Sequence, residues 1–166
     1  MKRIVSVALV LLLLAAIVPA TSMAAGAVSN GTRKVYHVHT YGGTLNLRRG
    51  PGKGYGVIGS LCNGTALVKK DSSCGWWKVR TMNGREGWVS SKYVRENARA
   101  NVNTRETGLN VRSSRCTSSS SNILYSIPHG TRGVTVYKVD CDWAYVKWGC
   151  HGKGWAALRY LKWTRW

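Results

Sequence analysis

Residues 45–51 read Leu-Asn-Leu-Arg-Arg-Gly-Pro, and residues 109–114 read Leu-Asn-Val-Arg-Ser-Ser. A second pair of related stretches follows each of these: Cys-Gly-Trp-Trp-Lys-Val-Arg at residues 74–80 and Cys-Asp-Trp-Ala-Tyr-Val-Lys at residues 141–147. Self-similarity of this kind sets the number of domains. The chain is therefore expected to hold two copies of one module of roughly sixty residues, a size near the lower limit for an independent core.

The pattern within each copy is that of short β-strands. Apolar and polar residues alternate, as in a half-buried strand, and Asn-Gly pairs at residues 63–64 and 83–84 are strong signals for hairpins. Residues 90–93 fit a single helical turn. The sequence predicts an all-β chain of two tandem small barrels. The expected strands of the first copy cover residues 35–41, 45–48, 57–61, 65–68, 76–80 and 85–89.

The start of the chain is typical of a secretory signal peptide. Lys2 and Arg3 precede an apolar run over residues 4–18, and small residues follow where a signal peptidase reads. A retained membrane anchor is the alternative, but the run falls short of the roughly 20 residues that a span needs. The expected organisation is a signal peptide (1–24), a flexible leader (25–34), a first domain (35–95), a polar linker (96–104) and a second domain (105–163).

The sequence is strongly basic, with a formal net charge of +19. Such an excess favours polyanionic partners, which include nucleic acid, anionic wall polymers and acidic membrane surfaces. Because an exported protein does not meet nucleic acid in its usual compartment, we expect no nucleic-acid partner. We also expect no stable membrane insertion once the signal peptide is removed. The predicted location is extracellular or at the cell wall.

The five cysteines of an exported chain suggest disulfides, with one thiol left over. Cys141 and Cys150 stand at opposite ends of one expected strand, too far apart for a bond. Cys116 with Cys141 is the preferred pair. Because the chain lacks a CxxC spacing and a Cys/His cluster, neither a metal site nor a cofactor is expected. Two histidines on one face of strand 35–41, His37 and His39, are the weak alternative.

Alternation also divides the aromatic residues between core and surface. Trp77 and Val79 share one face of strand 76–80, and this face is expected to be the core because Ala and Val occupy it in the second copy. The alternative is that the outward tryptophans pack on loops of their own domain. Eight Trp, eight Tyr and no Phe favour a binding surface instead. The aromatics expected to face outward are Trp76, Trp88, Trp143 and Trp155.

Three motifs of the first copy, in their order and spacing, resemble the bacterial SH3 (SH3b) domain. They are Leu-Asn-Leu-Arg-Arg-Gly-Pro-Gly (45–52), Gly-Trp-Trp-Lys-Val (75–79) and Asn-Gly-Arg-Glu-Gly-Trp-Val-Ser-Ser-Lys-Tyr-Val (83–94). Residues 41–95 match along nearly their whole length. Residues 105–162 match more loosely, because the Gly-Pro-Gly loop and the Asn-Gly hairpin are missing.

The resemblance implies small β-barrels in an exported bacterial protein that binds cell-wall peptidoglycan, often as the targeting part of a wall hydrolase. By similarity to eukaryotic relatives, which hold extended peptides in an aromatic groove, it also implies two ligand sites. Lys78 and Arg48 would add positive charge beside the first site. The implied lining residues are Trp76, Trp88 and Tyr93 in the first copy, and Trp143, Trp155 and Tyr160 in the second.

The leading hypothesis is a secreted protein without catalytic activity that binds peptidoglycan, its peptide or its glycan, through both modules. Two modules on one flexible linker would add avidity. A secreted effector or adhesin that binds a protein partner is the alternative. A wall hydrolase is the least favoured hypothesis, because two binding modules leave no third domain to carry catalysis. We therefore expect no enzyme and no catalytic residue.

Overall fold

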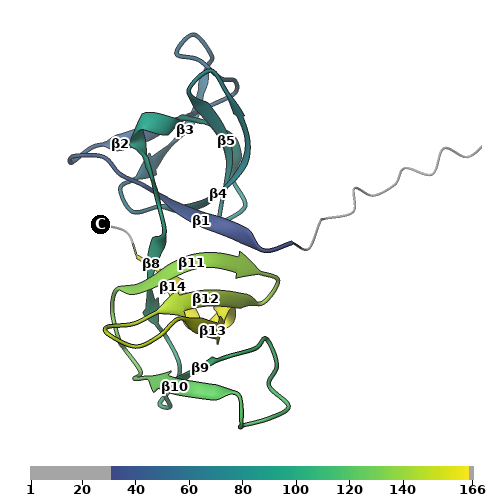
Figure 1. Ribbon diagram of the computed structural model, residues 1–166. Helices are drawn as coiled ribbons and strands as arrows, with labels where there is room; N and C mark the ends of the chain where they lie inside the picture. Colours follow the sequence, from purple (N-terminus) through teal and green to yellow (C-terminus); the bar gives the residue numbers. More distant parts are fainter. Residues whose placement is uncertain (1–30, 165–166) are drawn as a thin grey trace, which may run out of the picture.

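The computed structural model describes residues 31–164. The predicted signal peptide (1–24) and most of the predicted leader lie outside the described residues. Within them, strands dominate and the two helical elements are single 3-10 turns, which confirms the predicted all-β class (Figure 1). None of the helices described there is long and apolar enough to cross a membrane.

Fourteen strands and two turns make up the described chain, and most expected strands of the first copy appear within a few residues of their predicted bounds. The first half holds β1 (Arg33–Val38), β2 (Thr44–Arg48), β3 (Val57–Cys62), β4 (Ala66–Ser73), β5 (Trp76–Thr81), β6 (Glu86–Ser90), turn η1 (Ser91–Tyr93) and β7 (Val94–Glu96). The second half holds β8 (Ala98–Val102), β9 (Leu109–Arg112), β10 (Ile123–Ile127), β11 (Val134–Asp140), β12 (Trp143–Lys147), β13 (Gly154–Ala157), turn η2 (Leu158–Tyr160) and β14 (Leu161–Trp163).

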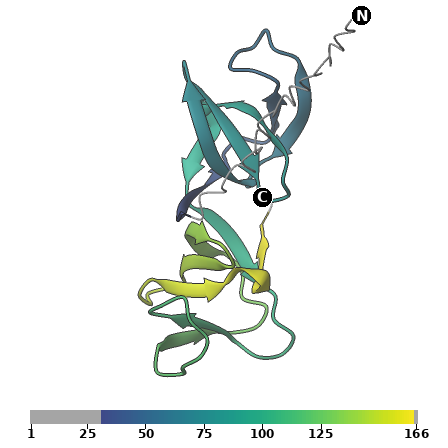
Figure 2. The same cartoon turned by 90° about the vertical axis from the view of Figure 1, so that its right-hand side faces the viewer.

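The strand order is the same in both halves. The first half runs β3-β2-β6-β5-β4-β1, with β7 also paired to β1, and the second runs β10-β9-β13-β12-β11-β8, with β14 paired to β8. Strand β1 joins the halves because it pairs with β4 and also with β11. The sheet is therefore continuous from β10 to β3 and is not closed, and the two halves stack end to end (Figures 1 and 2).

Two hydrophobic cores fill the molecule, and β4 contributes to both. Its residues Ala66, Leu67 and Val68 are all buried. Leu67 packs in the core of the first half, whereas Ala66 and Val68 join Val35 of β1 in the core of the second half. Three buried residues in succession are typical of a strand covered on both faces. The second half therefore packs its core directly against β1 and β4.

The segment predicted as a polar linker, residues 96–104, contains strand β8, so the prediction of an unstructured connection is wrong there. Ala98, Ala100 and Val102 are buried in the second core, while Arg99 and Asn101 alternate with them. This is the two-residue period of a strand. The prediction missed it because two of the three inward residues are alanines, which carry little apolar signal.

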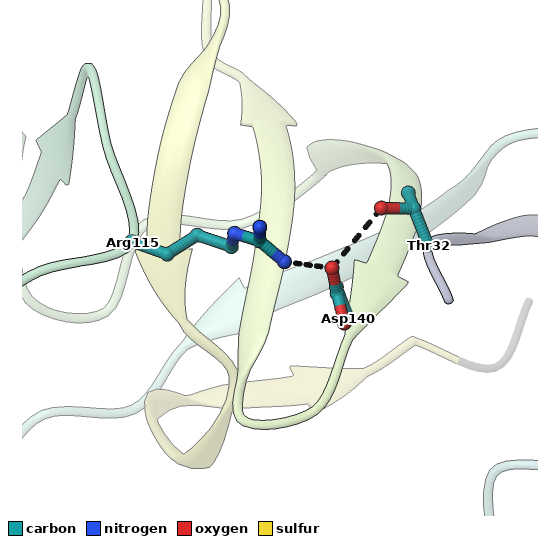
Figure 3. Close-up of polar contacts among 3 residues, drawn as sticks. All are labelled: Thr32, Arg115 and Asp140. Carbon is teal, nitrogen blue, oxygen red and sulfur yellow. Dashed lines mark hydrogen bonds and ion pairs between the residues drawn. The ribbon is translucent and has the colours of Figure 1, made fainter. Parts of the chain in front are cut away.

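A hydrogen bond to a buried carboxylate ties the residue just before β1 to the second half, and an ion pair holds the same carboxylate (Figure 3). Asp140, at the end of β11, is only 4% exposed. Its carboxylate accepts a hydrogen bond from Thr32 Oγ1 at 3.1 Å and pairs with the guanidinium of Arg115. The first described residues of the chain are thus anchored more than a hundred positions away in sequence.

Candidate functional site

A cavity of about 680 Å³ opens in the second half between β9, β12 and turn η2. Its aromatic walls are Trp143 of β12 and Tyr160 of η2, two of the residues expected to bind ligand. Arg105 and Asn110 are exposed and line it as well, as do threonines from the preceding loop. Arg112 is a second arginine in the lining. Rings for stacking, two guanidinium groups and amide or hydroxyl groups make a cavity suited to a polar ligand with flat or ring-shaped parts.

A backbone hydrogen bond helps to bring the two aromatic residues to the same cavity. Ala144 and Val146 of β12 are fully buried, so Trp143 lies on the opposite, outer face. The amide of Leu158 donates to the carbonyl of Asp142 at 2.7 Å and holds turn η2 beside the β11–β12 turn. Tyr160 therefore reaches the surface next to Trp143, with 41% of its area exposed.

Trp155 does not belong to this cavity, although it was expected to line a site with Trp143 and Tyr160. It faces Tyr145 across β12 and β13, with ring centroids 5.0 Å apart. The guanidinium of Arg115 lies 5.2 Å from its ring, and the ammonium of Lys138 lies 5.3 Å from it. Trp143 and Tyr160 therefore line the cavity, whereas Trp155 belongs to a neighbouring cluster of aromatic rings and cations.

In the first half, hydrogen bonds hold turn η1 beside the turn before β5 in the same way, near Trp76 and Tyr93. Ser91, the first residue of η1, donates from both its amide and its hydroxyl to the carbonyl of Gly75, at 3.0 and 2.8 Å. This places η1 beside the turn that precedes Trp76, which is half-buried. Tyr93 is 45% exposed. Two further tyrosines, Tyr41 and Tyr55, are exposed and lie in loops. Tyr41 was expected at the end of strand 35–41, but β1 ends at Val38.

Trp88 and Lys78 face each other across β5 and β6, one position along the outer surface from Trp76. Trp88 is half-buried and Lys78 is exposed. Lys78 stands opposite Asp71 of β4 on its other side. Both predicted residues are thus on the outer face, and the buried position of Val79 confirms which face of β5 is the core.

Arg48 holds a loop rather than projecting freely toward a ligand. Its Nη1 donates to the carbonyls of Lys53 and Tyr55, at 2.9 and 2.7 Å. Arg112, at the matching place in β9, donates to the carbonyl of Ser119 and to the side chain of Asn122. In both halves, then, the arginine that ends the strand organises the loop that follows it.

His37 lies in β1 and His39 lies just after the end of this strand, with ring centroids 6.1 Å apart, so the expected strand face of residues 35–41 is shorter than predicted. Both line a cavity with Glu96 and Asn97. Partial burial lowers the pKa of His37, although its hydrogen bond with the Asn97 carbonyl opposes this shift. Residues 31–164 bring together no group of three or more His, Cys, Asp or Glu side chains able to hold a metal.

All five cysteines lie within the described residues, and all are free and exposed. The predicted Cys116–Cys141 disulfide is therefore not formed in this structure. Cys116 Sγ lies 2.8 Å from the Ser118 hydroxyl, and this hydrogen bond is the main cause of a lowered pKa of the thiol.

Residues 43–95 match the family model of the bacterial SH3 domain. The chain therefore contains one bacterial SH3 domain there, and a second one at residues 105–163 stays a prediction. Over 134 residues the chain is 32% identical to "Putative N-acetylmuramoyl-L-alanine amidase YrvJ" of Bacillus subtilis. The alignment covers 70% of this chain and 25% of that protein, so the chain spans about a quarter of the length of the curated relative it matches.

Two solved structures from Trichomonas vaginalis are also similar. NlpC2 has a TM-score of 0.44 at 16% identity, over 79% of this chain and 48% of that one. NlpC1 has a TM-score of 0.39 at 14% identity, over 80% and 46% of the two chains.

The amidase relative overturns two predictions. The protein was expected to be a non-catalytic wall-binding protein, and a wall hydrolase was the least favoured hypothesis. The named relative is a hydrolase, and its alignment is longer than the SH3 match, so it extends beyond residues 43–95. Both predictions were wrong because they rested on the modules alone, and fold does not fix function.

Proposed function

We propose that this protein takes part in hydrolysis of the bacterial cell wall and that residues 31–164 bind its peptidoglycan. The observation that carries the proposal is the 32% identity over 134 residues to a protein named a putative N-acetylmuramoyl-L-alanine amidase, and the bacterial SH3 domain at residues 43–95 agrees with it. Such an amidase cleaves the bond that joins the peptide of peptidoglycan to its sugar. The amidase activity of the whole protein is itself part of the proposal, as is its secretion to the cell wall.

The cavity lined by Trp143 and Tyr160, which we call the groove, is chemically suited to bind peptidoglycan. Aromatic rings can stack on sugar rings or on flat peptide groups. The exposed guanidinium of Arg105 can pair with a peptide carboxylate, and the side chain of Asn110 can hydrogen-bond with a peptide amide. The equivalent residues of the first half, Trp76 and Tyr93, would form the second contact with the same polymer.

The common strand order supports a second SH3-like module that begins at β8 rather than after it. In this proposal β8 is the counterpart of β1, and the two modules are held rigidly through β1, β4 and β11. The avidity of two modules then depends on a fixed spacing between grooves instead of a flexible linker.

Co-sedimentation with purified peptidoglycan, stripped of phosphate polymers, tests the proposal that the protein binds peptidoglycan. We expect binding that persists at high salt and weakens at least about tenfold in Trp143→Ala, because stacked aromatics typically carry much of such affinity. Trp77→Leu, a change at a ring packed against Tyr36 at 5.1 Å, serves as the control for general damage. Equal binding by wild type and Trp143→Ala would refute the groove.

The proposed role in wall hydrolysis is tested by measuring the release of amino groups from peptidoglycan. The full chain is incubated with the polymer, alone and together with a wall amidase. We expect either direct release or faster release by the added enzyme. Unchanged amino-group release in both arms would refute a role in wall hydrolysis, whatever the binding assay shows.

A further inference from the structure

Strands β1 and β8 meet end to end along one edge of β11. Residues Val134–Val136 of β11 pair with β8, and Lys138 and Val139 pair with β1. The residue between these two pairings, Tyr137, coincides with a register shift between β11 and β12. The junction therefore brings side chains from both halves of the protein around one point.

This junction places two lysines directly opposite each other. Lys34 of β1 and Lys138 of β11 are Cα partners in an antiparallel pair. Like charges at such positions repel and destabilise a sheet. Lys153, from the loop before β13, adds a third ammonium, 4.1 Å from the ring of Tyr137.

The three lysines line a cavity of about 260 Å³ together with Tyr137, Tyr145 and Asn97. Glu96 also lines it and lies 3.7 Å from Lys34, but both side chains are mostly exposed. Lys138 lies 4.8 Å from the ring of Tyr145. Among the described residues, no carboxylate lies within ion-pair distance of Lys138 or Lys153, so two positive charges at the cavity lack a counter-charge.

The first half shows that this arrangement is not a by-product of the fold. The pairs Asp71–Lys78 and Lys138–Tyr145 occupy matching places, each just after the register shift of its hairpin. The first half therefore has a carboxylate where the second has Lys138, and a lysine where the second has a ring. The same backbone carries a balanced pair in one half and unbalanced positive charge in the other.

We propose that this cavity, which we call the junction site, binds a phosphodiester group of an anionic polyol-phosphate polymer. A phosphate is compact and suits lysine ammonium groups, which act as point charges. The small cavity fits one phosphate with its neighbouring carbons, and the tyrosine rings offer apolar contact to those carbons. This site is separate from the peptidoglycan groove and needs both halves of the chain.

Titration calorimetry of the protein with soluble poly(glycerol phosphate), which measures the binding affinity, tests the proposal. The test variant is Lys138→Gln with Lys153→Gln. The control is Lys53→Gln with Lys70→Gln, two exposed lysines of the first half, which makes the same change in net charge. A lysine close to an anionic surface contributes about fivefold, so we expect roughly 25-fold weaker binding in the test variant and little change in the control. Thermal unfolding checks that both variants fold.

Three outcomes would overturn the proposal. Equal weakening in both variants would mean that diffuse charge, not the junction site, attracts the polymer. Equal affinity of wild type for polyglutamate would mean that phosphate is not recognised. Binding to phosphatidylglycerol vesicles but not to the soluble polymer would assign the site to a lipid headgroup. Peptidoglycan stripped of phosphate polymers, measured in parallel, keeps failure of the groove distinct from failure of the junction site.

Discussion

The ion pair between Asp140 and Arg115 offers the sharpest test of how the carboxylate that anchors Thr32 is held. Asp140→Asn keeps the shape of the side chain and its hydrogen bond with Thr32, but it removes the charge that pairs with Arg115. The carboxylate is almost wholly buried, whereas half of the Arg115 side chain is exposed. In the variant, water can therefore solvate the guanidinium of Arg115 but cannot reach the side chain at position 140.

Hydrogen bonds to charged groups contribute about 1.5–3 kcal/mol, and solvent around Arg115 favours the lower part of this range. We expect Asp140→Asn to lower the free energy of unfolding by about 2 kcal/mol. For a chain of this size that corresponds to a fall in Tm of roughly 5 °C.

Urea unfolding followed by tryptophan fluorescence measures the effect, with Asp71→Asn as the matched control. Asp71 is exposed and accepts its hydrogen bond from the amide of Ser72, so its change should stay within about 0.5 kcal/mol. A double-mutant cycle with Arg115→Gln isolates the coupling between the two charges. Equal losses for both aspartates, or no coupling in the cycle, would refute a stabilising ion pair between Asp140 and Arg115.

Three further predictions concern the rest of the chain. Gly154→Ala should cost about 1–3 kcal/mol by thermal unfolding, because the new Cβ would lie 2.5 Å from Val111 Cγ1; Gly152→Ala, with open space around it, should not. Arg48→Gln should lower stability by about 1–2 kcal/mol through two lost loop hydrogen bonds, and unchanged stability with weaker ligand binding would assign it to the ligand instead. Since the pKa of His37 is lowered in the folded state, protonation favours unfolding. Stability should therefore be level above about pH 7 and fall as the pH drops through 6.5, and His37→Gln should remove this part of the slope in urea midpoints.

Much of the candidate site could be predicted from alternation alone. The buried positions of Val79 and Ala144 identify the core faces of β5 and β12, so Trp76 and Trp143 had to face outward. Alternation cannot say which outward residues share a cavity, because that depends on the loops and turns around them. Trp155 faces outward as expected, yet it packs with Tyr145 and not with Trp143.

The prediction of a linker between the two halves was wrong for a different reason. A segment with two small apolar residues looks like a linker when it is read by hydrophobicity, and only its pairing with β11 and β14 identifies β8 as a strand. In the same way, the sequence of β1 gives no sign that it pairs with two strands from different halves.

The short-range features of this protein follow from local sequence patterns. Period-two alternation, Asn-Gly turns and the repeated motifs act within one hairpin, so they specify strands, turns and core faces wherever they occur. The docking of the halves, the choice of rings that share a cavity and the pairing of Lys34 with Lys138 depend instead on long-range contacts. These contacts join residues far apart in the chain, and they arise because β1 and β4 bury a second face that local patterns do not encode.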